Sequence, residues 1–319
     1  MIKALAVSLC LLAAQWAAAA TPSDYPNRPV KFVVAWAPGG SADIGMRLVG
    51  EQLAVKWKQS VIVENRPGAA GAIGTDQVVR SAPDGYTALL NVSTLLVNEV
   101  TKPPASYRLF RDLVPVTTIW TTPVLLVASS SVRGNTLEAV LKEAAEPGAR
   151  FSYGHHGEGT STHIIGERLN KLAGSAMVGL PYAGDAPMSQ ALLGGHITMG
   201  FITATTAEKL VEAGKAKVLA QSFGERSKLF PAVPTFRQLG FEDMDKGTWA
   251  RVFLPAGTPG AIADKLAKDI DEVLKSNEIQ AKFKTLGIIV GGGTPADTLR
   301  QLQSDLVSWQ SLFRQMHKP

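Results

Sequence analysis

The segment 31–47, KFVVAWAPGGSADIGMR, constrains the fold of this chain more than any other. It contains the apolar, β-branched run 32–36, which predicts a strand buried on both faces. The turn PGG at 38–40 ends that strand, and Ser41 or Asp43 can cap the helix that follows. Such a turn aims unpaired N–H groups and the positive end of the helix dipole at one place. We therefore predict an anion site here, with an ordinary strand-to-helix turn as the alternative.

The first twenty residues have the pattern of an export leader. Lys3 supplies the positive charge, 4–16 the apolar core, and the alanines at 18–20 the cleavage site before Thr21. Cys10, the only cysteine, lies inside this leader, so we expect a mature chain without thiol, disulfide or lipid anchor. No later apolar stretch approaches the roughly 18 uninterrupted residues of a membrane span. The sequence thus predicts a signal peptide over 1–20 and a soluble protein of the periplasm.

The length and net charge of the chain indicate how many lobes it forms and which kinds of ligand it binds. Roughly 300 residues remain after the leader, which is large for one core and suits two lobes. The formal net charge is +5, but the basic residues are scattered singly and form no block. This surplus favours anionic small molecules only weakly, and it disfavours nucleic acid as a partner.

Strand-like and helix-like segments alternate along the chain, which is typical of an α/β protein with mainly parallel sheets. Strands are expected at 32–36, 60–64, 86–92, 123–128, 151–153, 197–202, 216–222, 249–254 and 288–290. Helices are expected at 41–57, 69–81, 136–145, 160–173, 261–276 and 295–316. The apolar residues of the last two helices recur at helical spacing, and we assign that stripe to core packing.

A second glycine-rich loop, GHHGEGTSTH at 154–163, again leads from a strand into a helix. Its glycines let the backbone approach a ligand, and the hydroxyls at 160–162 add donors at the helix start. Two such loops facing each other would hold a carboxylate from two sides. Hydrogen bonds to a charged group contribute about 1.5–3 kcal/mol each. Four or five of them, after association costs, suffice for micromolar binding at about −8 kcal/mol.

The histidines of this loop raise the alternative of a metal site. His155, His156 and His163 lie near one another in sequence, and Glu167 stands one helical turn after His163. The sequence nevertheless contains no HExxH motif and no evident third ligand on a helix. We therefore expect no metal, and we expect His163 to hydrogen-bond the backbone of its own loop.

Catalytic and cofactor motifs can be tested in the same way. An α/β-hydrolase elbow needs G-x-S-x-G, and 159–163 lacks the final glycine. The sequence GAAGAIG at 68–74 has GxxGxxG spacing rather than the dinucleotide pattern, so its small residues predict close helix packing. We expect neither an enzyme nor a bound cofactor.

Several motifs in one order cover nearly the whole mature chain and carry a family resemblance. They are APGGSAD at 37–43 with Arg47, VENRPGA at 63–69 with Gly71, PDGYT at 83–87, Pro181-Tyr182 with Gly184, and Trp249 with PAGTP at 255–259. With these motifs the chain resembles the Bug family of extracytoplasmic solute receptors, the periplasmic component of tripartite tricarboxylate transporters.

The resemblance implies a two-lobed periplasmic binding protein of Venus-flytrap, type II-like architecture with two crossover strands. We expect lobe 1 to comprise 21–123 and 249–319, and lobe 2 to comprise 124–248. In such receptors backbone amides and ordered waters in the loops hold a small carboxylate. The residues carried over to lobe 1 are Trp36, Gly39, Gly40, Ser41, Asp43, Asn91 and Ser93. Those carried over to lobe 2 are Gly157, Gly159, Thr160, Ser161, Thr162, His163, Tyr182 and Asp185, and His155 is added as a candidate that departs from the family pattern.

Three positions depart from the family pattern. The family usually has serine near His155 and a small residue near Asp185, and commonly has glycine where Arg251 stands. His155 and Asp185 would then contact a distal amine or hydroxyl of the ligand, and Asp185 would disfavour two simple carboxylates. The alternative is that both side chains point into solvent.

These observations favour a monomeric receptor that captures a small carboxylate and delivers it to the membrane subunits of a tripartite tricarboxylate-type transporter. A receptor of the same shape that docks on a signalling protein is the alternative.

Overall fold

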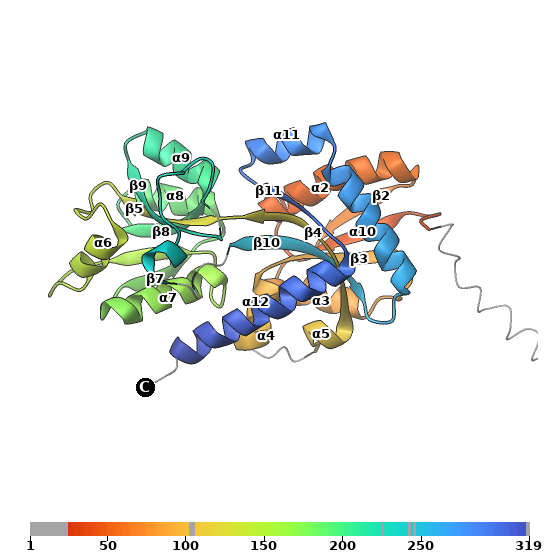
Figure 1. Cartoon of the computed structure of the whole chain (residues 1–319), viewed down its shortest axis with the longest axis horizontal. Coiled ribbons are helices and arrows are strands. Elements are labelled where there is room, and N and C mark those ends of the chain that lie inside the picture. Colours follow the sequence, from red (N-terminus) through yellow and green to blue (C-terminus); the bar gives the residue numbers. More distant parts are fainter. Residues whose placement is uncertain (1–24, 102–105, 225, 242–243, 245–246, 317–319) are drawn as a thin grey trace, which may run out of the picture.

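The computed structural model describes residues 25–101, 106–224, 226–241, 244 and 247–316 of the chain (Figure 1). The predicted signal peptide, 1–20, lies outside these residues. Two sheets with flanking helices form two lobes, which confirms the predicted α/β, two-lobed fold. No helix in these ranges is both long and apolar enough to span a membrane.

The first lobe is built on a six-stranded sheet of order β11-β4-β10-β3-β1-β2. Its strands are β1 (Val30–Val34), β2 (Val61–Asn65), β3 (Thr87–Val92), β4 (Leu113–Thr122), β10 (Thr248–Pro255) and β11 (Ile289–Gly292). Its helices are α2 (Ser41–Trp57), η3 (Ala69–Gly71), α3 (Ala72–Val79), α4 (Thr94–Thr101), α5 (Leu109–Asp112), α10 (Gly260–Leu274), α11 (Asn277–Thr285) and α12 (Pro295–Met316).

The second lobe is built on a five-stranded sheet of order β7-β6-β8-β5-β9. Its strands are β5 (Val124–Ser129), β6 (Ser152–His155), β7 (Val178–Pro181), β8 (Met199–Thr203) and β9 (Ala216–Ser222). Its helices are α6 (Leu137–Ala144), α7 (Ser161–Ala173), α8 (Asp185–Leu193), α9 (Ala204–Glu212) and η4 (Arg237–Leu239).

Both sheets are mixed, so the prediction of mainly parallel sheets is wrong. β1 pairs in parallel with β2 and β3, and β6 with β7 and β8. β10 and β11 run antiparallel to β4, and β5 runs antiparallel to β8 and β9. The antiparallel pairs involve the strands that carry the chain between the lobes, β4, β5 and β10, and the C-terminal strand β11.

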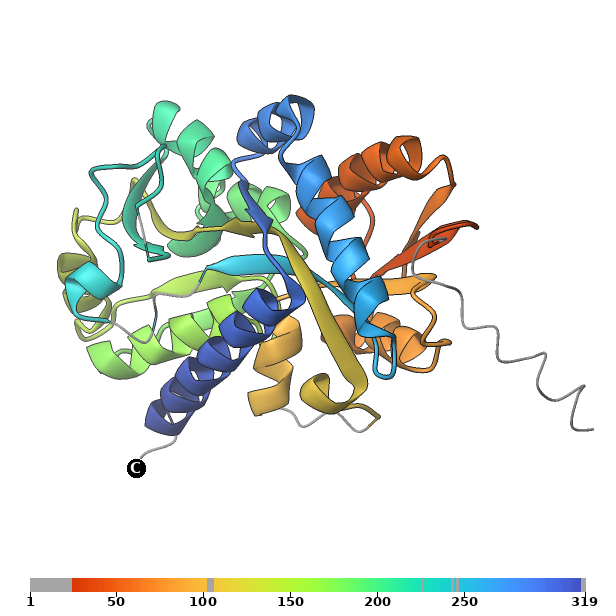
Figure 2. The ribbon, with the colours of Figure 1, turned by 45° about the vertical axis from the view of Figure 1, so that its right-hand side comes forward.

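The chain passes between the two sheets twice, as predicted. It leaves the first sheet at Pro123 and returns to it with β10, whose first residue Thr248 pairs with Thr122 at the end of β4. Helix α12 adds a link that the sequence did not predict: it packs on β4 and α4 and also reaches α7 (Figures 1 and 2). There Arg168 Nη2 donates to Gln315 Oε1 at 2.7 Å. The limits of each lobe along the chain stay a prediction.

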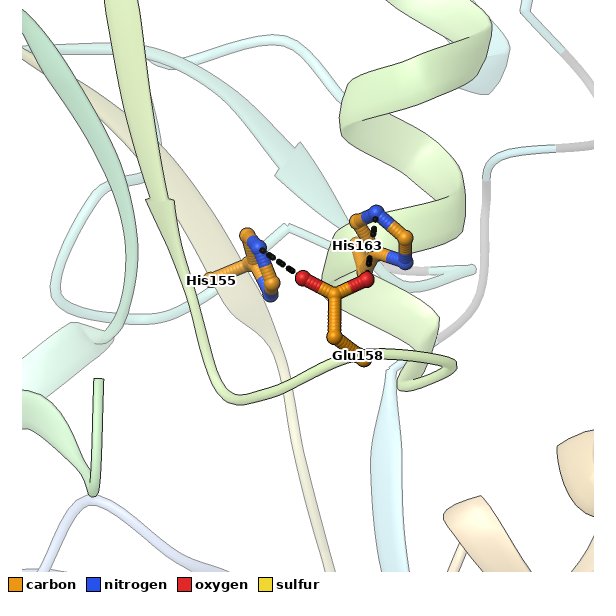
Figure 3. Close-up of side chains that lie close together, drawn as sticks. All are labelled: His155, Glu158 and His163. Carbon is orange, nitrogen blue, oxygen red and sulfur yellow. Dashed lines mark ion pairs between the residues drawn. The ribbon is translucent and has the colours of Figure 1, made fainter. Parts of the chain in front are cut away.

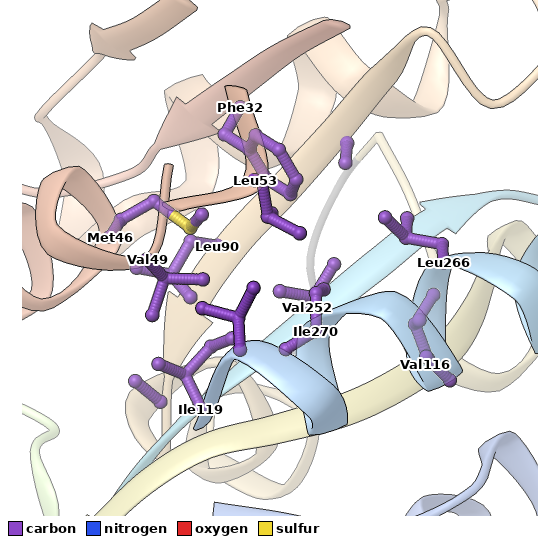
Figure 4. Close-up of a cluster of buried hydrophobic side chains, with 14 of the residues drawn as sticks. Phe32, Met46, Val49, Leu53, Leu90, Val116, Ile119, Val252, Leu266 and Ile270 are labelled. Atoms are coloured by element: carbon purple, nitrogen blue, oxygen red, sulfur yellow. The ribbon is translucent and has the colours of Figure 1, made fainter. Parts of the chain in front are cut away.

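The first sheet is covered on both faces, which explains the apolar run of β1. Phe32 and Val34 pack into a cluster beneath α2 and α10, part of which Figure 4 shows. Val33 and Ala35 pack into the opposite cluster, beneath α3, α4 and α12. The predicted strand buried on both faces is therefore confirmed.

Gly74 confirms the predicted close packing of the GxxGxxG segment. A Cβ there would lie 2.9 Å from the Arg66 carbonyl oxygen and 3.0 Å from Ala35 Cα, and backbone atoms cannot yield as a flexible side chain can. We expect Gly74→Ala to lower the free energy of unfolding by about 1–3 kcal/mol, measured by denaturant titration. Gly260→Ala is the control, because its Cβ would meet no atom within 4 Å. Equal stability of the two variants would contradict the packing argument.

Candidate ligand-binding site

The N-terminus of α2 is open to an acceptor. Gly40 is its N-cap residue, and no side chain caps the helix. Residues 39–41 are exposed, so the N–H groups of the first turn and the positive end of the helix dipole face outward. The prediction that Ser41 or Asp43 caps this helix is wrong, because Ser41 is the first helical residue and the Asp43 carboxylate bonds elsewhere.

Asp43 organises the loop before α2. Its buried carboxylate accepts hydrogen bonds from the Gly39 N–H and from Arg47 Nε, both at 2.9 Å. Burial by itself would raise the pKa of Asp43, but hydrogen bonds from Arg47, the Gly39 N–H and Asn65 hold that pKa below its usual value. The amide of Gly39 is therefore occupied within the protein, and the prediction that it faces a ligand is wrong.

Asn91 is placed behind Trp36. Trp36 Nε1 donates to Asn91 Oδ1 at 2.9 Å, and Asn91 Nδ2 donates to Thr75 Oγ1 at 2.9 Å. Since Asn91 is fully buried and both ends of its amide are used, its evident effect is to hold the indole. Ser93, also buried, donates its N–H to the Trp249 carbonyl oxygen at 3.1 Å and so joins the end of β3 to β10.

The N-terminus of α7, in contrast to that of α2, is capped by a side-chain hydroxyl. Thr160 caps the helix by accepting the His163 N–H, and its hydroxyl donates to the Gly157 carbonyl oxygen at 2.7 Å. Thr162 Oγ1 accepts the His156 N–H at 3.1 Å. Thr160, Ser161 and Thr162 are all buried. This helix start therefore has fewer free donors than the sequence predicted.

Imidazole rings occupy the glycine amides of the same loop. The Gly157 N–H donates to His155 Nδ1 at 3.2 Å, and the Gly159 N–H donates to His163 Nδ1 at 3.1 Å. These two amides are therefore used within the loop, and the predicted bond of His163 to the backbone of its own loop is confirmed.

Glu158, which sequence reasoning missed, completes a cluster with the two histidines (Figure 3). Its Oε1 lies 3.6 Å from His155 Nε2, and its Oε2 lies 3.3 Å from His163 Nε2. The three side chains offer atoms within 4.8 Å of one another, which is compact enough for a metal ion. Glu167, the ligand considered from the sequence, instead accepts the Tyr153 hydroxyl. Burial, followed by the neighbouring His163, lowers the pKa of His155.

Asp185 is held inside the second lobe. Its carboxylate lies 2.8 Å from His156 Nε2 and accepts the N–H of Thr203 at 2.9 Å. The alternative that His155 and Asp185 point into solvent is therefore wrong, since His155 is fully buried as well. Tyr182 is half-buried and donates its N–H to the His155 carbonyl oxygen at 2.8 Å, which fastens this turn to the end of β6.

Asp185 makes stability depend on pH. Burial alone would raise its pKa, but His156 and Thr203 hold that pKa below its usual value. A lowered pKa in the folded state means that the carboxylate stabilises the fold fully above its unfolded pKa near 3.9. That contribution is lost as the pH falls through the lower folded value. We expect Asp185→Asn to destabilise by about 1.5 kcal/mol at pH 7.

Melting temperatures from pH 7 down to pH 3 test this expectation. The difference between wild type and Asp185→Asn should shrink below about pH 4, where the unfolded chain takes up the proton. Asp264→Asn, at an exposed position of α10, is the control and should show no such trend. A difference that stays constant with pH would show that the charge of the Asp185 carboxylate does not stabilise the fold.

Both loops adjoin one apolar cluster. Ile164, in the first turn of α7, is buried in the cluster that contains Ala35, and Trp36 packs against that cluster from the loop before α2. The open helix start of the first lobe and the histidine loop of the second therefore flank a common surface at the junction of the lobes. Such a fold and site define a two-lobed periplasmic binding protein.

The chain belongs to the tripartite tricarboxylate transporter family receptors, because the TctC family model matches residues 46–317. BugT of Bordetella pertussis is 31% identical over 318 residues, which are 99% of this chain and 98% of that protein.

Solved structures agree with this assignment. The periplasmic binding protein BugD is 29% identical with a TM-score of 0.77, over 92% of this chain and 98% of BugD. An R. palustris protein solved with adipate is 27% identical with a TM-score of 0.81, over 92% of this chain and 98% of that one. MatC from Rhodopseudomonas palustris, solved with bound malate, is 27% identical with a TM-score of 0.79, over 90% of this chain and 99% of MatC.

Proposed function

We propose that this protein is a periplasmic receptor that captures a small carboxylate between its lobes and delivers it to the membrane subunits of a tripartite tricarboxylate-type transporter. The observation that carries the proposal is the uncapped, exposed N-terminus of α2 at the junction of the lobes. Two relatives of the same fold were solved with adipate and with malate, which are both carboxylates.

The chemistry of capture follows from the α2 N-terminus. A carboxylate oxygen placed before the first turn accepts the N–H groups of Gly40, Ser41 and Ala42, and it lies at the positive end of the helix dipole. Each such bond contributes about 1.5–3 kcal/mol because the acceptor is charged. Asp43 is already paired with Arg47, so its own charge opposes the ligand less than a free carboxylate would.

Closure of the lobes completes the site. The paired ends of β4 and β10 are the segments at which the chain passes between lobes, so rotation about them brings the histidine loop toward α2. The closed receptor then presents a combined surface of both lobes to the transporter. The predicted leader would direct export and be cleaved after Ala20, so N-terminal sequencing of the mature protein should begin at Thr21.

Titration calorimetry of the mature protein tests the capture step. Malate and adipate should release heat and raise the melting temperature, and the corresponding diamides should do neither, because they have no negative charge to place at the helix start. Absence of binding to any member of a wide panel of organic acids would overturn the proposal. Uptake of the bound acid by cells should require both this receptor and the membrane subunits.

A further inference from the structure

His155 and His163 stand side by side in the second lobe. Their ring centroids lie 4.5 Å apart and the ring planes are tilted by 31°. Figure 3 shows the Nε2 edges of both rings turned toward the carboxylate of Glu158. Two ring nitrogens from different elements, the end of β6 and the start of α7, thus converge on one carboxylate.

Hydrogen bonds from the backbone determine which nitrogen of each ring carries the proton. Nδ1 of each ring accepts a glycine N–H, so each Nδ1 carries a lone pair and each Nε2 carries the proton. The two Nε2 atoms are therefore hydrogen-bond donors. A metal ion at the same place would need lone pairs on Nε2 and protons on Nδ1, which the two glycine amides oppose. The cluster is consequently built for an anion rather than for a cation.

Glu158 is a poorly placed hydrogen-bond acceptor for His155 and His163. The distance from its Oε1 to His155 Nε2 is 3.6 Å, well beyond a normal N–H···O hydrogen bond, and His155 Nε2 is buried without a hydrogen-bond partner among the described residues. An unsatisfied buried donor is unfavourable, so a better-placed acceptor would bind there. The Glu158 side chain is 62% exposed and lies between Gly157 and Gly159, which both have positive φ.

We infer that His155 and His163 form a second carboxylate site, which Glu158 covers when no ligand is bound and which the distal acid group of a dicarboxylate ligand occupies. This inference rests on the proposed function, in which the other acid group binds at α2. Asp185 does not oppose such a ligand as the sequence suggested, because His156 and Thr203 already engage its charge. The receptor therefore discriminates dicarboxylates from monocarboxylates at the histidine pair.

Calorimetry with adipate and hexanoate, which differ by one acid group, tests the inference. Glu158→Gln removes the competing charge and should raise the affinity for adipate about tenfold, with little change for hexanoate. His163→Phe keeps the ring but removes the donor, and it should lower the affinity for adipate about tenfold while hexanoate binding is retained. His196→Gln, at an exposed position of the same lobe, is the control and should change neither.

Failure of this inference is distinguishable from failure of the proposed function. If both acids bind equally and neither variant alters their ratio, the histidine pair is not a carboxylate site although the receptor still binds acids. Nitrogen NMR of the unliganded protein should show both rings protonated at Nε2, and Nδ1–H forms would overturn the argument. Micromolar binding of Zn²⁺ by wild type that is lost in His163→Phe would also overturn it.

Discussion

Gly40→Val is expected to weaken carboxylate binding about 30-fold with almost no change in stability. Gly40 has φ −80° and ψ 168°, which any residue adopts, and a Cβ there would meet only the Ala37 carbonyl oxygen at 3.7 Å. The position is also exposed, so the fold tolerates a side chain. The branched side chain would hold an anion away from the first-turn N–H groups of α2. Losing one such charged hydrogen bond accounts for about 2 kcal/mol, or roughly 30-fold in Kd.

Calorimetry measures that affinity, and thermal melts of the same samples measure stability. Gly40→Ala, with one methyl group, should give a smaller loss, and Gly224→Val should give none, because a Cβ at Gly224 would meet no atom within 4 Å. Unchanged affinity in Gly40→Val would mean that the helix start is not the anion site.

Arg251→Met is expected to lower the free energy of unfolding by about 3 kcal/mol. Arg251 lies on β10 and is only 3% exposed. It donates from Nε to Thr118 Oγ1 at 3.2 Å and from Nη2 to Gln301 Oε1 at 3.0 Å. Burial lowers its pKa to about 10, against the opposing effect of Asp305, so it stays charged at neutral pH. Its removal deprives α12 of polar contacts with the strand that joins the lobes.

Denaturant titration measures this loss. Arg251→Lys keeps the charge but lacks the fork of donors, and it should fall between wild type and Arg251→Met. Arg300→Met is the control, because Arg300 lies on α12, the helix that Arg251 contacts. Its side chain is 69% exposed, so the change in the free energy of unfolding should stay within about 0.5 kcal/mol. If Arg251→Met lowers the free energy of unfolding no more than this control does, the buried guanidinium does not stabilise the contact between β10 and α12.

Much of the fold could be predicted from local patterns. The run at 32–36 is apolar at every position because both faces of its sheet are covered, and α12 has its apolar residues at helical spacing, with Leu302, Trp309 and Leu312 buried. β4 was missed although it is the longest strand. It contains Pro115 and four threonines, so its sequence has no continuous apolar run. Val116, Ile119 and Trp120 are nevertheless buried in the core, on a strand that lies between β10 and β11.

The candidate site likewise combines features that the sequence predicts with features that only the structure shows. The motif APGGSAD determined by itself that a strand turns into a helix through glycine, because turn chemistry and helix starts are local properties of the chain. Side chains two or four residues away in the chain occupy three of the glycine amides, although the sequence predicted only the bond of His163. Asp43, His155 and His163 each accept a nearby glycine N–H, and the Glu158 carboxylate lies against both histidine rings. Only the tertiary structure decided that the two loops meet. Ile164 of the second lobe and Trp36 of the first lie at one apolar cluster, and no linear spacing of residues specifies a contact between segments so far apart in the sequence.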